Sequence, residues 1–290
     1  MNRIKYFREG VLKSDLILEI GPYVNPLFPK CEGWNVISND VFSYDQLLKK
    51  ANSDHNLDDD AISRIEPVDY VGETTKVFNL NSNYDGKVDY IISSHNLEHI
   101  PNPIKFLKTC QKLLKDNGHL ILALPDYRCC WDRFRPLSSC ADWLQSYHED
   151  SIKPSAKQIF VQNSMHCRWN DNGILRATMP LQTKLSELIP LETLENAYQK
   201  FIENLKKGDS LDYIDTHCWT FTLDSFQLIL LDLFFLKYIN FFPLDISFQN
   251  SSEFLINLQK RTSWTLPKKD FYKRRMKLFQ AIASFHSDQL

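Results

Sequence analysis

Polar and ionisable side chains follow several short apolar runs of this sequence, at the places where strands of a parallel sheet would end. In an open parallel sheet, ligands bind at the carboxyl ends of the strands, close to the point where the strand order reverses. Residues at these ends are therefore the first candidates for a binding site. In chain order they are Glu19, Gly21, Asp40, Ser94, His95, Asn96 and Asp126.

The turn after the first apolar run, GPYVNP (21–26), contains a single glycine. A dinucleotide needs several glycines there, because backbone N–H groups must approach its pyrophosphate. S-adenosylmethionine (SAM) has no phosphate and needs only one close approach of the backbone beside its methionine moiety. Asp40 follows the second apolar run about 20 residues after Gly21, a spacing that suits hydrogen bonds from ribose hydroxyls. Together the turn and the acid favour SAM over NAD(P).

Two histidines are candidates for moving a proton. Transfer of a methyl group from SAM is an in-line displacement, and a hydroxyl acceptor must also lose its proton to a base or a bound metal. His95, at the end of the fourth apolar run, would act as this base or orient the cofactor through a hydrogen bond. His217, in DTHCWTF, is the second candidate, with Asp215 placed to orient it. We interpret His99 as structural, and because no paired ligand motif is present we predict no metal.

The stretch DYRCCWDRFRP (126–136) alternates arginines with aromatic residues. Guanidinium groups bind anionic groups through paired hydrogen bonds, and aromatic rings stack on sugar rings, so this composition suits an anionic or phosphorylated sugar. Asp126 would orient a histidine, contact a hydroxyl or cap the following turn. The residues predicted to contact the acceptor are Tyr127, Arg128, Arg133, Arg135 and His148.

The elements that position these residues alternate between strands and helices in the first half of the chain, which predicts parallel strands joined by crossover helices. A helix over 43–51 has Ser43 as its N-cap, and a helix over 102–115 begins near Pro103 and ends at Asn117 and Gly118. A further helix at 223–235 precedes a terminal hairpin of 237–248 with 253–260. The predicted parallel strands are 16–20, 34–38, 68–72, 88–94 and 119–125.

The segment SSHNLEHIPNPIKFLKTCQKLLKDNGHLILALPD (93–126) resembles class I SAM-dependent methyltransferases between their fourth and fifth strands. In that family an LEH-type element follows strand four, and an LLK-NG-L element precedes strand five. More narrowly, EIGPYVNPLF, PDYRCCWDRFRPLSSCADWL and DTHCWTFTLDSF resemble a bacterial subfamily associated with surface-polysaccharide biosynthesis. The general resemblance covers residues 15–126 and 223–260.

This resemblance implies an α/β fold with a Rossmann-like, seven-stranded class I methyltransferase sheet, helices on both faces and a large insertion after strand five. Tyr23 and Asn25 replace the usual second and third glycines, so either Asn25 makes a polar contact with SAM or the affinity for SAM is reduced. The implied contacts to the methionine part, the ribose and the adenine are, in turn, Glu19 with Gly21, Asp40, and Asp69.

The resemblance divides the chain into four parts. A SAM-binding core occupies 1–126, and an insertion that would bind the acceptor as a lid occupies 127–219. Residues 220–262 complete the core with a helix and the hairpin, and a basic helical tail occupies 263–290.

The composition excludes several classes of protein. The chain has 290 residues, of which 43% are hydrophobic, enough for a large core. Its 34 basic and 36 acidic side chains give a formal net charge of -2, which predicts no global attraction to nucleic acid or to an anionic membrane. The seven cysteines are scattered, which favours reduced thiols. The sequence has no run of about 18 apolar residues, so we predict no transmembrane segment. We expect a soluble cytoplasmic protein that can work beside a membrane.

The function expected from these observations is SAM-dependent O-methylation of a sugar hydroxyl or glycan terminus, within a membrane-associated biosynthetic complex. Methylation of a small molecule or a phosphate is an alternative within the same fold. A catalytically silent SAM-fold scaffold in a polysaccharide assembly complex is another, and the basic tail would suit docking. An NAD(P) oxidoreductase is disfavoured because phosphate-binding glycines are absent. A nucleic-acid partner is disfavoured because the sequence has no basic face and no NPPY-like or PC motif.

Overall fold

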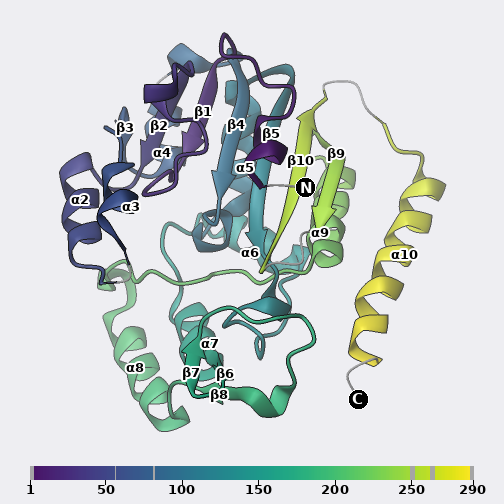
Figure 1. Ribbon diagram of the computed structural model, residues 1–290. Coiled ribbons are helices and arrows are strands. Elements are labelled where there is room, and N and C mark those ends of the chain that lie inside the picture. The colour runs from purple at the N-terminus through teal and green to yellow at the C-terminus, as the bar shows by residue number, and fades with distance from the viewer. Residues whose placement is uncertain (1–2, 56, 81, 249–251, 262–264, 288–290) are drawn as a thin grey trace.

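The central sheet sets the positions of all the strand ends. The computed structural model describes the chain except for residues 1–2, 56, 81, 249–251, 262–264 and 288–290. Its larger sheet has seven strands in the order β3-β2-β1-β4-β5-β10-β9 (Figure 1). The strands are β1 (Ile17–Ile20), β2 (Val36–Asp40), β3 (Tyr70–Val71), β4 (Val88–Ser94), β5 (Leu114–Pro125), β9 (Phe241–Phe248) and β10 (Glu253–Lys260).

Strands β1 to β5 are parallel, whereas β10 runs antiparallel to both β5 and β9. The predicted fold class and the predicted terminal hairpin are therefore confirmed. The chain moves outward from β1 to β3 and then returns to place β4 on the other side of β1. The strand order thus reverses between β1 and β4, which is where a ligand is expected.

Helices and loops cover both faces of this sheet. Buried residues of α4, α5, α6 and α9 form the larger core on one face, and α1 packs with the loop at 27–28 on the other. The helices, with the residues that each one spans, are α1 (Arg3–Arg8), α2 (Tyr44–Asn52), α3 (Asp59–Ser63), α4 (Thr74–Leu80), α5 (Pro103–Leu113), α6 (Cys140–His148), α7 (Ala156–Met165), α8 (Leu194–Lys207), α9 (Leu223–Phe235) and α10 (Lys268–Ser287).

Local sequence determines where several of these helices begin. Ser43 caps α2 in a capping box with Gln46, as predicted, and Pro103 takes the first position of α5. The predicted end of α5 at Asn117 and Gly118 is wrong. The helix stops at Leu113, because the backbone N–H groups of Gly86 and Lys87, just before β4, bind its last carbonyls and β5 begins at once.

The insertion after β5 contains a small antiparallel sheet that the sequence pattern did not predict, in the order β7-β6-β8. Its strands have three to five residues each, too few for a clear alternation of apolar and polar residues. This sheet lies near α7 and α8, below the central sheet in Figure 1. The strands are β6 (Cys167–Asp171), β7 (Ile174–Arg176) and β8 (Leu188–Pro190).

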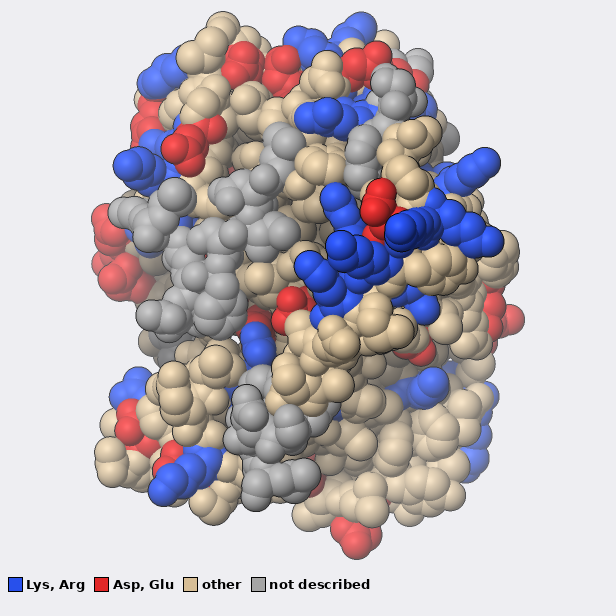
Figure 2. Space-filling view, turned by 90° about the vertical axis from the view of Figure 1, so that its right-hand side faces the viewer, with Lys and Arg blue, Asp and Glu red and all other residues tan. Residues whose placement is uncertain are grey.

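Helix α10 lies along α9 at the edge of the molecule. Phe271 stacks on Phe235 with ring centroids 3.8 Å apart, and Arg275 forms an ion pair with Asp232 at 2.8 Å. Figure 2 shows Lys and Arg side chains gathered on the face that carries this helix. Among the described residues, none of the helices combines the length and the apolar character that a membrane span requires.

Helix α6 belongs energetically to the core, although it lies within the insertion of the sequence. Trp143 on this helix is fully buried, with its ring centroid 5.9 Å from that of Phe221 and 6.1 Å from that of Phe226. We expect Trp143→Ala to lower the free energy of unfolding by about 3–5 kcal/mol, because the truncation leaves a cavity. Urea denaturation measures this change.

Leu194→Ala is the matched control, since Leu194 is 64% exposed and its truncation should change the free energy of unfolding by less than about 0.5 kcal/mol. Equal effects of the two substitutions would contradict the assignment of α6 to the core.

Candidate functional site

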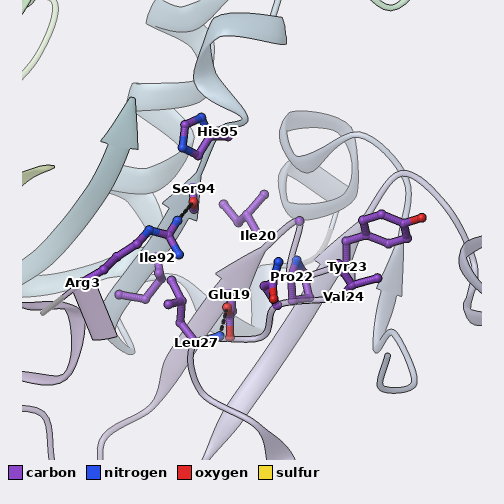
Figure 3. Close-up of a pocket in the computed structure, with 12 residues that line it drawn as sticks. Arg3, Glu19, Ile20, Pro22, Tyr23, Val24, Leu27, Ile92, Ser94 and His95 are labelled. Carbon is purple, nitrogen blue, oxygen red and sulfur yellow. Dashed lines mark hydrogen bonds between the residues drawn. The ribbon is translucent and has the colours of Figure 1, made fainter. Parts of the chain in front are cut away.

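A cavity of about 320 Å³ opens where the strand order reverses, between the carboxyl ends of β1 and β4 (Figure 3). Arg3, Ser94 and His95 lie on one side of this pocket, and the turn with Tyr23 lies on the other. The lining includes five of the residues predicted for the cofactor: Glu19, Gly21, Asn25, Ser94 and His95.

The turn of the pocket is fixed by Glu19. Its two carboxylate oxygens accept hydrogen bonds from the backbone N–H groups of Leu27, at 2.6 Å, and Phe28, at 3.0 Å. Burial raises the pKa of Glu19 to about 7, although these two hydrogen bonds oppose the shift. Each oxygen thus accepts one backbone hydrogen bond, and Glu19 both shapes the turn and lines the floor of the pocket.

Gly21 and Tyr23 both have positive φ angles, 67° and 41°. A glycine adopts this region freely, whereas a tyrosine is strained there. The ring of Tyr23 points away from Arg3 and Ser94 in Figure 3, and its centroid lies 5.6 Å from the ammonium of Lys50. The side chain that replaces the usual glycine therefore leaves the pocket open.

Three predicted cofactor residues do not line this cavity. Asp40 is 8% exposed at the carboxyl end of β2, where burial raises its pKa and the Phe42 N–H donates to Oδ1 at 3.0 Å. Asp69 lies before β3 and binds the Ser38 N–H at 2.8 Å, in addition to an ion pair with a lysine. Asn96 donates to the Ser93 hydroxyl at 3.2 Å.

Two residues missed by the sequence reasoning lie at or near these strand ends. Because β3 ends at Val71, Glu73 rather than Asp69 follows its carboxyl end, and the rule for strand ends applied to the predicted strand 68–72 would also have found Glu73. Arg3 enters the pocket from α1 and forms an ion pair with Glu253 at 2.8 Å. Its guanidinium also donates to the Ser94 hydroxyl (Figure 3). No sequence motif marks Arg3.

His95 stands at the rim of the pocket, with a positive φ of 48°. Its Nε2 lies 2.8 Å from Glu253 Oε2, and its Nδ1 lies 3.6 Å from Glu98 Oε1. Burial lowers the pKa of this imidazole, but the two carboxylates outweigh it and raise the pKa to about 9. The ring therefore holds its proton at neutral pH, which suits a hydrogen-bond donor better than a base.

A second cluster of ionisable groups lies directly behind His95. The segment 215–219 returns to the loop after β4, where the Cys218 N–H donates to the Glu98 carbonyl at 2.7 Å. This contact brings His217 to His99, with ring centroids 4.6 Å apart and perpendicular planes. Glu98, His99 and His217 each offer one ligand atom within 4.8 Å of the others.

Each histidine of this cluster binds its own aspartate through Nδ1. His217 lies 2.6 Å from Asp132, and His99 lies 2.8 Å from Asp215, so Asp215 does not orient His217 as predicted. Trp131 Nε1 also approaches His217 Nδ1, at 3.2 Å, but one nitrogen cannot both donate and accept. The shorter, charge-assisted bond to Asp132 assigns a proton to Nδ1, so in the neutral imidazole Nε2 is the nitrogen that can accept a proton or a metal.

Asp126 and the three arginines are bound within the protein. Asp126 is fully buried and caps the turn after β5 by accepting from the Arg128 backbone N–H at 3.0 Å. The Arg128 guanidinium also donates to both its oxygens, at 2.7 and 2.6 Å. Arg133 donates to the Arg128 carbonyl at 2.6 Å. Arg135 binds Asp132 at 2.7 Å. These arginines fix the segment that carries Asp132 next to His217.

The other predicted acceptor contacts lie apart from the histidine cluster. Tyr127 is 7% exposed in the turn that Asp126 caps. His148 ends α6 and binds the Tyr238 hydroxyl at 2.9 Å, on the side of α6 that faces α5 rather than the pocket. Of the predicted catalytic residues, the structure brings together His95 and His217 through Glu98 and leaves Asp126 in a separate ion pair.

The sequence matches a family model described as a methyltransferase domain over residues 8–233. No curated protein matches it.

Several solved structures are similar in fold. A SAM-dependent methyltransferase from Methanosarcina mazei is 15% identical, with 91% of this chain and 99% of that chain covered and a TM-score of 0.44. A Rhodobacter sphaeroides protein provisionally named a Zn-dependent alcohol dehydrogenase is 10% identical, with 89% of each chain covered and a TM-score of 0.46. A SAM-dependent methyltransferase from Mesorhizobium loti is 9% identical, with 89% and 98% covered and a TM-score of 0.42. Likenesses at this level carry no argument about function.

Glu253 is the group that we expect to control the charge of His95. Because the pKa of His95 is raised from 6.5 to about 9, the protonated ring stabilises the folded state fully below pH 6.5 and loses this effect as the pH rises through 9. Glu253→Gln should bring the pKa of His95 back toward 6.5, as measured by NMR titration of the imidazole. The same substitution should reduce stability more at pH values below 6.5 than above 9.

Glu187→Gln is the control, because Glu187 binds Trp169 in the insertion and does not contact His95. A pKa of His95 that stays near 9 in Glu253→Gln would show that another group holds the proton.

Proposed function

Because the chain belongs to the methyltransferase-domain family, with SAM as its methyl donor, we propose that it methylates a hydroxyl of a sugar or of a glycan terminus. The observation that carries this proposal is the pair of Asp132 and His217, 2.6 Å apart. It fixes an imidazole with a bare Nε2 behind the pocket, and a hydroxyl acceptor requires such a proton acceptor or a metal. Trp131, partly exposed, has its ring centroid 5.1 Å from that of His217 and 5.2 Å from the guanidinium carbon of Arg168, so aromatic and cationic groups that suit a sugar acceptor lie beside the imidazole.

In this proposal the methionine part of SAM occupies the pocket beside Gly21, and its carboxylate binds the guanidinium of Arg3. The ribose hydroxyls extend toward Asp40 at the end of β2. The adenine then lies past β3, where Glu73 is better placed than Asp69 because Glu73 follows the carboxyl end of β3, whereas Asp69 precedes this strand. The sulfonium methyl faces His95, the last residue along the pocket before the histidine cluster.

The insertion, the cysteines and α10 suggest how the enzyme would bind its acceptor and where it would work. The small sheet with α7 and α8 would serve as the acceptor lid, since the insertion also carries Trp131 and Asp132. All seven cysteines are free thiols, which suits a reducing, cytoplasmic compartment. The exposed basic residues of α10 would support docking to a membrane-associated biosynthetic complex (Figure 2).

Arg3→Gln tests the placement of SAM. Hydrogen bonds to charged groups contribute about 1.5–3 kcal/mol, so this substitution should weaken SAM binding by about 10- to 100-fold in calorimetry. Binding of 5'-methylthioadenosine, which lacks the amino-acid carboxylate, should be unchanged. Lys5→Gln is the control, because Lys5 is exposed on the same helix and does not line the pocket. Equal loss of affinity for both ligands would contradict the contact between Arg3 and the carboxylate.

Mass spectrometry of surface glycans tests the acceptor. A strain that lacks the gene should lose the mass of one methylene group from a glycan fragment, and His217→Ala should cause the same loss because the proton acceptor is removed. Restoration by the wild-type gene and by Glu187→Gln provides the control. Unchanged glycans, together with SAM binding by the purified protein, would direct the search to a small molecule or a phosphate. The absence of SAM binding would favour the silent scaffold.

A further inference from the structure

We propose that Glu98, His99 and His217 bind one divalent transition-metal ion directly behind the SAM pocket. The three ligands come from two segments that are far apart in the sequence, so no paired motif announces the site. Their donor atoms lie within 4.8 Å of one another, close enough for a single ion to bind all three after small side-chain movements. The site revises our expectation that no metal is bound.

Glu98 supplies the strongest argument for a cation. The residue is 1% exposed, and among the described residues neither of its carboxylate oxygens has a hydrogen-bond partner. Its closest polar neighbours are His95 Nδ1, at 3.6 Å, and His99 Nε2, at 4.0 Å. A buried anion without hydrogen bonds is costly unless a cation binds it.

The two histidines are already oriented as metal ligands. A metal-binding histidine usually donates its other ring nitrogen to a carboxylate, which fixes the tautomer and aims the free nitrogen at the ion. His99 binds Asp215 and His217 binds Asp132, each through Nδ1. Both Nε2 atoms are therefore available to the ion. A histidine with a purely structural role needs only one hydrogen-bond partner. Here two separate aspartate–histidine pairs converge on one carboxylate, as the ligands of a metal ion would.

Asp132 is itself held in place. Arg135 donates to its other oxygen at 2.7 Å, and both side chains are almost fully buried. The aspartate therefore meets His217 Nδ1 at 2.6 Å from a fixed position, which leaves Nε2 of His217 to face the cluster.

The donor set indicates the class of ion. Two imidazoles and one carboxylate suit Zn²⁺, Fe²⁺, Co²⁺ or Mn²⁺ better than Mg²⁺ or Ca²⁺, which prefer oxygen ligands. Three protein ligands leave at least one position open for water or substrate. No cysteine belongs to the group, so the site differs from a closed structural zinc site.

The role of the ion rests on the proposed function. Because an ion bound to His217 Nε2 prevents this nitrogen from accepting a proton, the ion rather than the imidazole would promote loss of the hydroxyl proton. A hydroxyl bound at the open position would lose its proton to water more readily, because the metal stabilises the alkoxide. The alkoxide oxygen would then form a bond to the methyl carbon of SAM as the carbon–sulfur bond breaks. The electron pair stays on sulfur, and S-adenosylhomocysteine leaves.

The experiment measures metal binding by the full chain, without SAM or acceptor. Protein stripped with a chelator is titrated with Zn²⁺ by calorimetry and with Co²⁺ by visible absorption, which reports coordination directly. We expect one ion per chain, with a dissociation constant in the micromolar range or below, and a higher melting temperature with Zn²⁺. Glu98→Gln and His217→Ala should each weaken binding by about 100-fold or more, and Asp132→Asn by about 10- to 100-fold.

His119→Gln is the matched control, because His119 is a partly buried histidine that contacts Asn257 away from the cluster, and its metal affinity should equal that of the wild type. Circular dichroism confirms that each variant is folded. If Glu98→Gln does not fold, His217→Ala tests the site in its place. No binding by the wild-type chain, or equal binding by His217→Ala, would overturn the site and leave protonated His95 and His99 as the cations that neutralise Glu98. If the protein binds the metal but the glycans of the deletion strain are unchanged, the metal site would stand and the proposed glycan acceptor would be wrong.

Discussion

The hydrogen bond from the Cys218 backbone to the Glu98 carbonyl is the contact on which the site depends. It joins the end of the insertion to the loop that follows β4, and Trp219 strengthens the junction through its indole N–H, which donates to the Ile100 carbonyl at 2.7 Å. Without this junction His217 would lie on the insertion alone and His99 on the core alone. Because both contacts involve the backbone or a buried ring, they fix the relative position of the two histidines.

The pocket for SAM depends on a different device. A dinucleotide-binding turn relies on repeated glycines. This turn has one glycine, and the buried carboxylate of Glu19 binds the backbone N–H groups of Leu27 and Phe28 at its end. Glu19 thereby holds the loop from Pro22 to Phe28 in a wide arc, and the ring of Tyr23 is directed out of the cavity (Figure 3). A ligand without a pyrophosphate requires no more than this, since no row of backbone N–H groups has to face it.

Charges in the insertion serve mainly to position other groups. The arginines of DYRCCWDRFRP have the composition of an anion-binding loop, but they are largely buried and bind Asp126, Asp132 and nearby carbonyls. Their burial is consistent with the cost of leaving an ionised group unpaired in the interior. The segment they stabilise carries Asp132 to His217, so their contribution to the site is indirect.

The sequence by itself determined the seven strands of the larger sheet, the helix starts at Ser43 and Pro103, and the positions of His95 and Gly21 at strand ends. These features depend on local patterns, such as short apolar runs and capping residues, which involve only residues close together in the sequence. Only the tertiary structure decided that Asp132 rather than Asp215 binds His217, that Arg3 enters the pocket, and that Glu98 lies between three histidines. The physical reason is that these contacts join segments distant in the chain, and a side chain's charge and partner follow from burial and distance, which sequence spacing does not specify.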